Sequence, residues 1–163
     1  MLKLYKHDAS GRPTHYHEAW VHGSQIIEHW GTLGERGENR QHPRDPKRSE
    51  EADIERVLAK AIANGYEPLG EDAESILIIE YPVKGMGTGQ DLDKRGAVED
   101  LMNEVLGWTG LGMCDGGSIG SGSMEVVCVV ADYDTAQRVI AAELKGTIYA
   151  DYSRIYNEGA AGH

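Results

Sequence analysis

An indole and a run of basic side chains lie close together in the first third of the chain. Trp30 precedes five Lys or Arg residues in residues 36–48, a segment with only two acidic residues. An indole face can stack a base, an interaction worth about 1–3 kcal/mol, and basic side chains can contact phosphate. We therefore predict a surface that binds nucleic acid or a protein partner. Its residues are Trp30, Gly31, Thr32, Arg36, Arg40, Arg44, Lys47 and Arg48.

The same pattern also fits a solvated basic loop beside a tryptophan that belongs to the core, and this alternative stays open. Tryptophan is usually buried over most of its surface while one edge remains in water. Two prolines, Pro43 and Pro46, lie within the basic segment. They would stiffen the loop, which favours a defined surface.

Histidines are the second group that could carry chemistry, since six of the seven fall in residues 1–70. His15 and His17 would share one face of a strand, but a zinc site needs four ligands, or three and a water. The sequence places no third ligand. We interpret these residues as surface and strand histidines, and we predict no metal, no cofactor and no catalytic residue. The other histidines considered are His22, His29 and His42.

A glycine-rich segment at residues 85–89 follows an apolar run. Such loops can hold phosphate through backbone N–H groups at the start of a helix. Gln90 breaks the G-x-G-x-x-G pattern, and Asp91 and Asp93 would repel an anion. We interpret the segment as a flexible connection.

The two cysteines, Cys114 and Cys128, would face each other across a hairpin centred on Ser121. Directly opposite residues in such a pair lie about 4.5–5.5 Å apart at Cβ. A reversible thiol pair is conceivable, but buried structural cysteines are commoner. Two cysteines are also too few for a disulfide framework. The expected state is therefore a pair of reduced thiols.

Charge is distributed unevenly along the 163 residues, whose net charge is −11. Residues 1–70 hold 10 Lys+Arg and 11 Asp+Glu, whereas residues 71–163 hold 6 and 16. This asymmetry predicts two domains with different partners. The acidic half should repel nucleic acid, so only the first half could approach a phosphate backbone. There is no N-terminal apolar signal and no apolar run of about 18 residues, which predicts a cytoplasmic protein without a membrane partner.

Four strands and one helix are expected in the first half. β-type runs predict strands over residues 2–6, 14–21, 25–30 and 38–42. Ser49 is a good N-cap and an acidic first turn follows it. The apolar stripe of the helix consists of Ile54, Val57, Leu58, Ala61 and Ile62. These elements predict a small antiparallel sheet covered by one helix.

The second half reads as strand, helix, two strands, helix and strand. The strands are expected over residues 75–83, 111–115, 124–131 and 147–156, with a glycine-rich loop at 116–122. One helix would run from about residue 93 to 107. Asp132 would cap the other, which turns Ala136, Val139, Ile140 and Leu144 inward. This βαββαβ order is typical of ferredoxin-like folds, so we predict an α+β protein whose second domain covers residues 73–158.

The segment Trp30-Gly31-Thr32-Leu33-Gly34-Glu35-Arg36-Gly37 resembles the core signature of WGR domains. The resemblance extends over about residues 1–68 and implies a small antiparallel sheet with one helix. In that family the signature tryptophan and arginine contribute to contacts with DNA ends and neighbouring domains. The third position here is Thr32, which has no guanidinium group, so Arg36 or Arg40 would have to replace it. The second half resembles no family beyond its ferredoxin-like pattern.

These observations predict a non-enzymatic binding protein whose WGR-like surface engages nucleic acid or a protein partner. The alternative is an inhibitor or immunity-type protein, whose acidic residues 71–163 would block a basic enzyme. Charge steering would make that association fast and sensitive to salt. A small phosphate-binding enzyme that uses residues 85–89 ranks below both.

Overall fold

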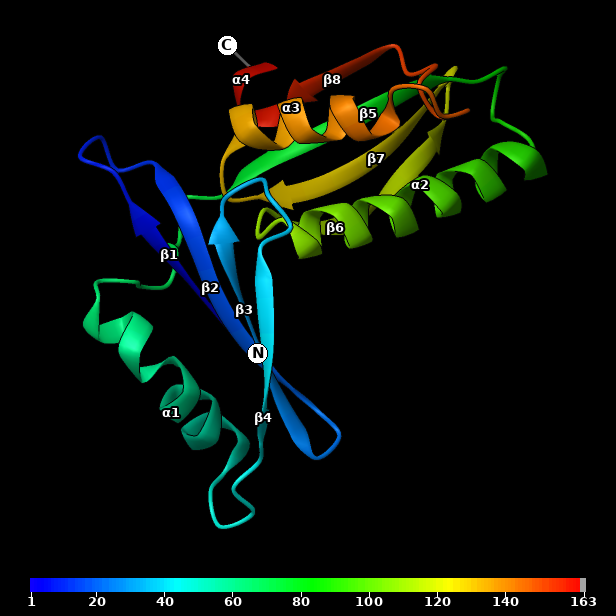
Figure 1. Ribbon diagram of the computed structural model, residues 1–163. Helices are drawn as coiled ribbons and strands as arrows, with labels where there is room; N and C mark the ends of the chain where they lie inside the picture. Colours follow the sequence, from blue (N-terminus) through cyan, green and yellow to red (C-terminus); the bar gives the residue numbers. More distant parts are fainter. Residues whose placement is uncertain (162–163) are drawn as a thin grey trace.

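Within its described residues, this α+β protein has two four-stranded antiparallel sheets and four helices (Figure 1). The computed structural model describes residues 1–161. Within that range, no helix combines the length and the apolar character needed to cross a membrane. The predicted α+β class is confirmed at this level.

The first sheet is a meander of strands β1 (Leu2–His7), β2 (Pro13–His22), β3 (Gln25–Thr32) and β4 (Glu38–Pro43), paired in that order. Helix α1 (Glu50–Ala63) packs along one face. The Ser49 side chain accepts a hydrogen bond from the Ala52 N–H at 3.2 Å, as expected of an N-cap. Every element predicted for this half is confirmed, with ends shifted by one or two residues.

The core beneath α1 is small, which explains why one residue of its predicted apolar stripe, Ile62, is exposed. Ile54 and Leu58 pack on Leu4 and Ile26 of the sheet. Ile62 was expected to face inward but is 46% exposed. It lies at the margin of the apolar stripe, and the buried face is too narrow to reach it.

The second sheet has strand order β6-β7-β5-β8, with every neighbouring pair antiparallel. In chain order its elements are β5 (Ser75–Pro82), α2 (Gly89–Trp108), β6 (Gly112–Gly120), β7 (Ser123–Val130), α3 (Tyr133–Leu144), β8 (Arg154–Asn157) and α4 (Glu158–Ala161). Helices α2 and α3 cover the same face of this sheet (Figure 1). The four inward residues predicted for α3 are all buried, and Asp132 caps the helix as expected.

Three boundaries in this half differ from the prediction. Helix α2 begins at Gly89, one turn before residue 93, because Thr88 and Asp91 form a capping box. The expected loop at 116–122 is largely strand β6, since pairing with β7 outweighs the weak strand preference of glycine. The last strand runs from residue 154 to 157, whereas residues 147–156 were predicted.

The two sheets share a continuous core. Tyr5, Tyr16 and Leu33 of the first half are buried in the same apolar cluster as the second sheet and its helices. The Tyr5 hydroxyl donates to the Gly110 carbonyl at 2.8 Å. The Gly34 N–H donates to the Thr109 carbonyl at 3.0 Å. The residues that join the halves therefore come from the face of the first sheet opposite α1, from the turn that follows β3 and from the turn that ends α2.

Gly110→Ala tests how tightly Tyr16 holds this junction. A Cβ at Gly110 would lie 2.2 Å from the Tyr16 ring, and the residue has φ +70°. Gly65→Ala is the matched control, because Gly65 also has positive φ but open space around it. We expect Gly65→Ala to cost about 1–2 kcal/mol from backbone strain alone, and Gly110→Ala to cost roughly 1–3 kcal/mol more from overpacking. Equal losses in urea unfolding would contradict this account of the junction.

Candidate functional site

Trp30 is half-buried at the end of β3, on the sheet face that also carries α1. Its register partner on β2 is His17, whose ring stacks on the indole with centroids 5.6 Å apart and an interplanar angle of 26°. On β4, two residues beyond the register partner Glu38, Arg40 places its guanidinium over the indole, 5.7 Å from the ring centroid. The indole is thus fixed between an imidazole and a cation, and it keeps part of its surface in water.

Glu28 holds the histidines of this face in place. Its two carboxylate oxygens contact His17 Nε2 at 2.7 Å and His42 Nε2 at 2.6 Å. Burial by itself raises the pKa of Glu28, but the hydrogen bonds from the two imidazoles outweigh it, so the pKa lies below its ordinary value. Tyr66, just after α1, places its ring edge-on to His17 with centroids 5.6 Å apart. Glu28 and Tyr66 thus brace the His17 ring on which Trp30 stacks, and His42 holds Glu28.

The basic residues predicted for the site do not gather beside the indole. Arg36 Nη1 lies 3.7 Å from Glu104 of α2. Arg44 pairs with Glu50 at 3.4 Å and approaches the buried Asp53 at 3.7 Å. Of the predicted cations, Arg40 alone contacts Trp30 within the described chain.

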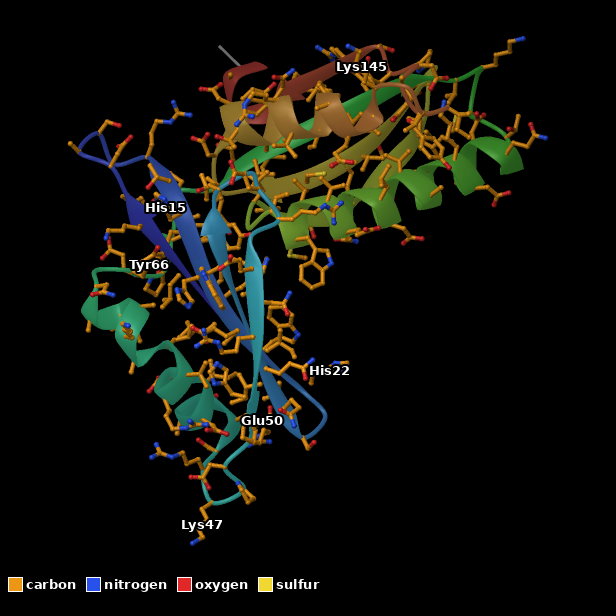
Figure 2. The ribbon with its side chains drawn as sticks, viewed as in Figure 1. His15, His22, Lys47, Glu50, Tyr66 and Lys145 are labelled. Carbon is orange, nitrogen blue, oxygen red and sulfur yellow. The ribbon has the colours of Figure 1, made fainter. Side chains whose placement is uncertain are left out.

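Two more of the predicted cations lie in the loop between β4 and α1. Arg48 pairs with Asp45 at 3.2 Å, and Lys47 is exposed at the tip of the loop. Figure 2 places Lys47 at the opposite end of the first sheet from His15. The predicted single strip is therefore divided into separate groups along β4 and its flanking loops.

Gly31 and Thr32 end β3 and lead into the turn at residues 33–37, which packs against the second half. Thr32 is exposed and pairs with His15 on β2. The turn wraps around the Tyr16 hydroxyl, which donates to the Glu35 carbonyl at 2.7 Å. A Cβ at Gly37 would lie 2.1 Å from the Trp30 carbonyl oxygen, so no other residue fits there. The glycine spacing of the signature thus shapes a structural turn.

Behind that turn, His29 and Glu18 form a buried pair on the sheet face opposite Trp30. His29 Nδ1 lies 2.8 Å from Glu18 Oε1, and Nε2 lies 2.6 Å from the Arg36 carbonyl oxygen. Lys3 Nζ is 3.4 Å from the other Glu18 oxygen. Each buried polar atom of the pair has a partner, as buried charges require.

The remaining sequence candidates show structural roles. At residues 85–89, the Asp91 carboxylate accepts from the Thr88 N–H at 2.8 Å and so occupies the place of an anion at the start of α2. Cys114 and Cys128 are opposite each other in the β6–β7 register, as predicted, and both are buried free thiols. The hydrogen bond from Cys128 lowers the pKa of Cys114. Across residues 1–161, no three His, Cys, Asp or Glu residues are grouped to hold a metal ion.

Sequence reasoning did not assign to the site the side chains that surround Trp30 and brace its neighbours. These are Lys6, His17, Glu28, His42 and Tyr66. Alternation along β3 does place Glu28 and Trp30 on one face. The other four come from β1, β2, β4 and the segment after α1, and they meet only once the strand register is known.

No family model, curated protein or solved structure matches this chain. The chemistry of the site therefore has to be argued from its own geometry. That geometry offers an aromatic and cationic surface of five side chains. We name it the Trp30 surface: Lys6, His17, Trp30, Arg40 and Tyr66.

Glu28→Gln should make unfolding less sensitive to acid. Because the pKa of Glu28 is lowered in the folded protein from an ordinary value of 4.5, its stabilising contribution is present above that value and is lost as pH falls through the lowered pKa. We expect Glu28→Gln to lower the free energy of unfolding by no more than about 1 kcal/mol at pH 7, because solvent screens the ion pairs. At about pH 4 the reduction should be smaller. Glu38→Gln, an exposed carboxylate opposite Trp30, is the control in urea unfolding. A loss that does not change with pH would contradict the role of the two imidazoles.

Proposed function

We propose that this chain is a non-enzymatic, cytoplasmic binding protein whose WGR-like first half, residues 1–68, binds nucleic acid through the Trp30 surface. The observation that carries the proposal is the Arg40 guanidinium held 5.7 Å over the Trp30 ring. The signature of WGR domains has an arginine where this chain has Thr32. Arg40 supplies a guanidinium group beside the same indole from the neighbouring strand. This contact supports Arg40 as the replacement for the signature arginine that is absent at Thr32.

The neighbours of Trp30 support contact with a phosphate backbone. Lys6 is exposed, with its ammonium 5.7 Å from the Tyr66 ring centroid. His15 is also exposed, two residues before His17 on the same strand. Aromatic faces beside cations are the combination that binds exposed bases and their phosphates. A nucleic-acid end offers an unstacked face to such a surface, whereas an intact duplex hides its bases.

The surface we propose is smaller than the one expected from sequence. Arg36, Arg44 and Arg48 each face a carboxylate, so a phosphate would have to displace an existing ion pair to reach them. Arg40 forms no ion pair within residues 1–161. Few phosphate contacts are thus available, which favours a weak interaction whose affinity falls only gradually as the salt concentration rises.

For the second half we propose a ferredoxin-like domain over residues 73–158. The strand order β6-β7-β5-β8 and the two helices on one face support this assignment. Each half of the pattern, strand-helix-strand, returns its second strand parallel to the first with one strand between them. The role proposed for this domain is to hold the WGR-like half in position through the shared core.

A second candidate function is the inhibitor of a basic protein. Helix α2 carries exposed carboxylates at Asp93, Asp100 and Glu104, which lie along one side of the helix. A row of this kind favours association with a basic surface. It lies in the half that carries most of the negative charge.

Arg40→Ala tests the proposed function in the full-length chain. We expect the wild-type protein to bind a short blunt-ended DNA duplex at about 50 mM salt, with each phosphate contact adding about 0.9 to the slope of log K against log salt. Arg40→Ala should weaken binding about threefold to tenfold, since a charged hydrogen bond contributes about 1 kcal/mol or more. Fluorescence anisotropy of labelled DNA measures both quantities.

Lys145→Ala is the control, because Lys145 is an exposed lysine of the second half, far from the Trp30 surface in Figure 2. A duplex closed by hairpins at both ends tests whether an end is required. Absence of binding at about 50 mM salt, or equal losses for Arg40→Ala and Lys145→Ala, would refute the nucleic-acid proposal. Capture of a basic protein by the same chain would then favour the inhibitor.

A further inference from the structure

A cavity of about 670 Å³ lies between the two sheets, on the face of the first sheet opposite Trp30. The face of β1 and β2 opposite α1 forms one wall. The end of α2 and the start of β6 form the other. Its size falls within the range of about 300–1,000 Å³ that is usual for small-molecule sites. The residues that line it include Lys3, Glu18, Trp20, Glu74, Trp108 and Met113.

Two indoles form the aromatic part of the cavity. Trp20 and Trp108 meet edge to face, with centroids 6.3 Å apart and an interplanar angle of 75°. The Trp108 ring is also fixed against the buried His29, at 5.1 Å. Even so, Trp108 remains 39% exposed and Met113 at the mouth remains 56% exposed. Held aromatic faces that stay open to solvent fit an apolar or aromatic ligand.

Charged groups of both signs line the cavity: Met1 with its terminal ammonium, Lys3, Glu18 and Glu74. Lys3 and Glu18 pair with each other at 3.4 Å, and Glu18 also contacts His29. Glu74 is exposed at the rim and forms no ion pair within residues 1–161. Burial first, and then the Glu18 and Glu74 carboxylates, raise the pKa of Tyr5 well above its ordinary value. Of the two carboxylates that line the cavity, Glu74 is thus the one without an ion-pair partner in the described residues.

From this arrangement we infer that the cavity binds an organic cation, an ammonium group carried on an apolar or aromatic body. The body lies against Trp20 and Trp108, and the ammonium faces Glu74. Indole faces attract cations through their negative π-surface, by about 0.5–1 kcal/mol at exposed positions. The long-range field of a chain with net charge −11 also concentrates cations at its surface.

The proposed site is independent of the proposed function. Trp20 and Trp30 lie on opposite faces of the first sheet, because their positions on β2 and β3 fall in alternate register rows. The three tryptophans of the chain thus report on two separate surfaces. Loss of DNA binding would leave the cavity unchanged, and an empty cavity would leave DNA binding unchanged.

Three indole probes that differ in charge test the inference on the full-length protein. Tryptamine carries an ammonium, tryptophol a neutral hydroxyl and indole-3-acetate a carboxylate. We expect tryptamine to bind about two- to fivefold more tightly than tryptophol, and indole-3-acetate to bind most weakly. Titration is followed by NMR of the indole N–H signals. Those of Trp20 and Trp108 should shift, and that of Trp30 should not.

Two variants assign the effect to this cavity. Glu74→Gln should remove most of the preference for tryptamine over tryptophol. Met113→Lys, which places a like charge at the mouth, should weaken tryptamine binding at least about threefold. Met86→Lys makes the same change at a methionine that is 73% exposed and does not line the cavity, and it should have no effect.

The inference is overturned if tryptophol or indole-3-acetate binds as tightly as tryptamine, or if only the Trp30 signal shifts. It is equally overturned if none of the probes binds, or if Met86→Lys and Met113→Lys have the same effect. An unchanged pattern of dispersed amide signals in each variant establishes that the fold is intact.

Discussion

The hydroxyl of Tyr16 is the point on which both halves of the protein depend. It donates to the Glu35 carbonyl at 2.7 Å, and it lies 3.2 Å from His29 Nε2 and 3.3 Å from the Trp108 carbonyl oxygen. These partners belong to the first sheet, to the turn that follows β3 and to the end of α2. A fully buried hydroxyl must keep a partner, so the three segments have to meet at one place. The relative position of the sheets follows from this requirement.

Residues 30–37 have two separate roles: the turn closes on Tyr16, and Trp30 presents its indole on the opposite face of the sheet. The glycines of the turn allow the backbone to close on Tyr16, and Leu33 fills the shared core. Trp30 precedes the turn and faces the other side of the sheet, where Arg40 and His17 hold it. The shape of the signature is thus needed for docking the two halves, while its indole stays available on the opposite face.

Local patterns predicted the elements well where they also determine burial. The inward face of α3 and the facing positions of Cys114 and Cys128 followed from periodicity and from the symmetry of a hairpin. The first part of β6 was predicted, but residues 116–120 were expected to be loop, because this glycine-rich run carries no alternation and only its pairing with β7 makes it extended.

The candidate site was harder to predict than the fold. The number of basic residues after Trp30 does not indicate which of them form ion pairs with carboxylates. Arg36, for example, pairs with Glu104, which lies 68 positions later in the sequence. The cation beside the indole depends on the β3–β4 register, and the Trp20–Trp108 contact depends on how two sheets pack. Neither the Arg40–Trp30 contact nor the Trp20–Trp108 contact can be predicted from a short stretch of sequence.

The shared core also has a consequence for synthesis on the ribosome, where the N-terminal segment emerges first. Tyr5, Tyr16 and Leu33 are buried by residues that are translated after position 70. Until those residues arrive, the nascent first sheet exposes apolar side chains on one face, a condition that invites aggregation or chaperone binding. The molecule thus completes its interior only late in translation, although its first sheet is assembled from neighbours in sequence.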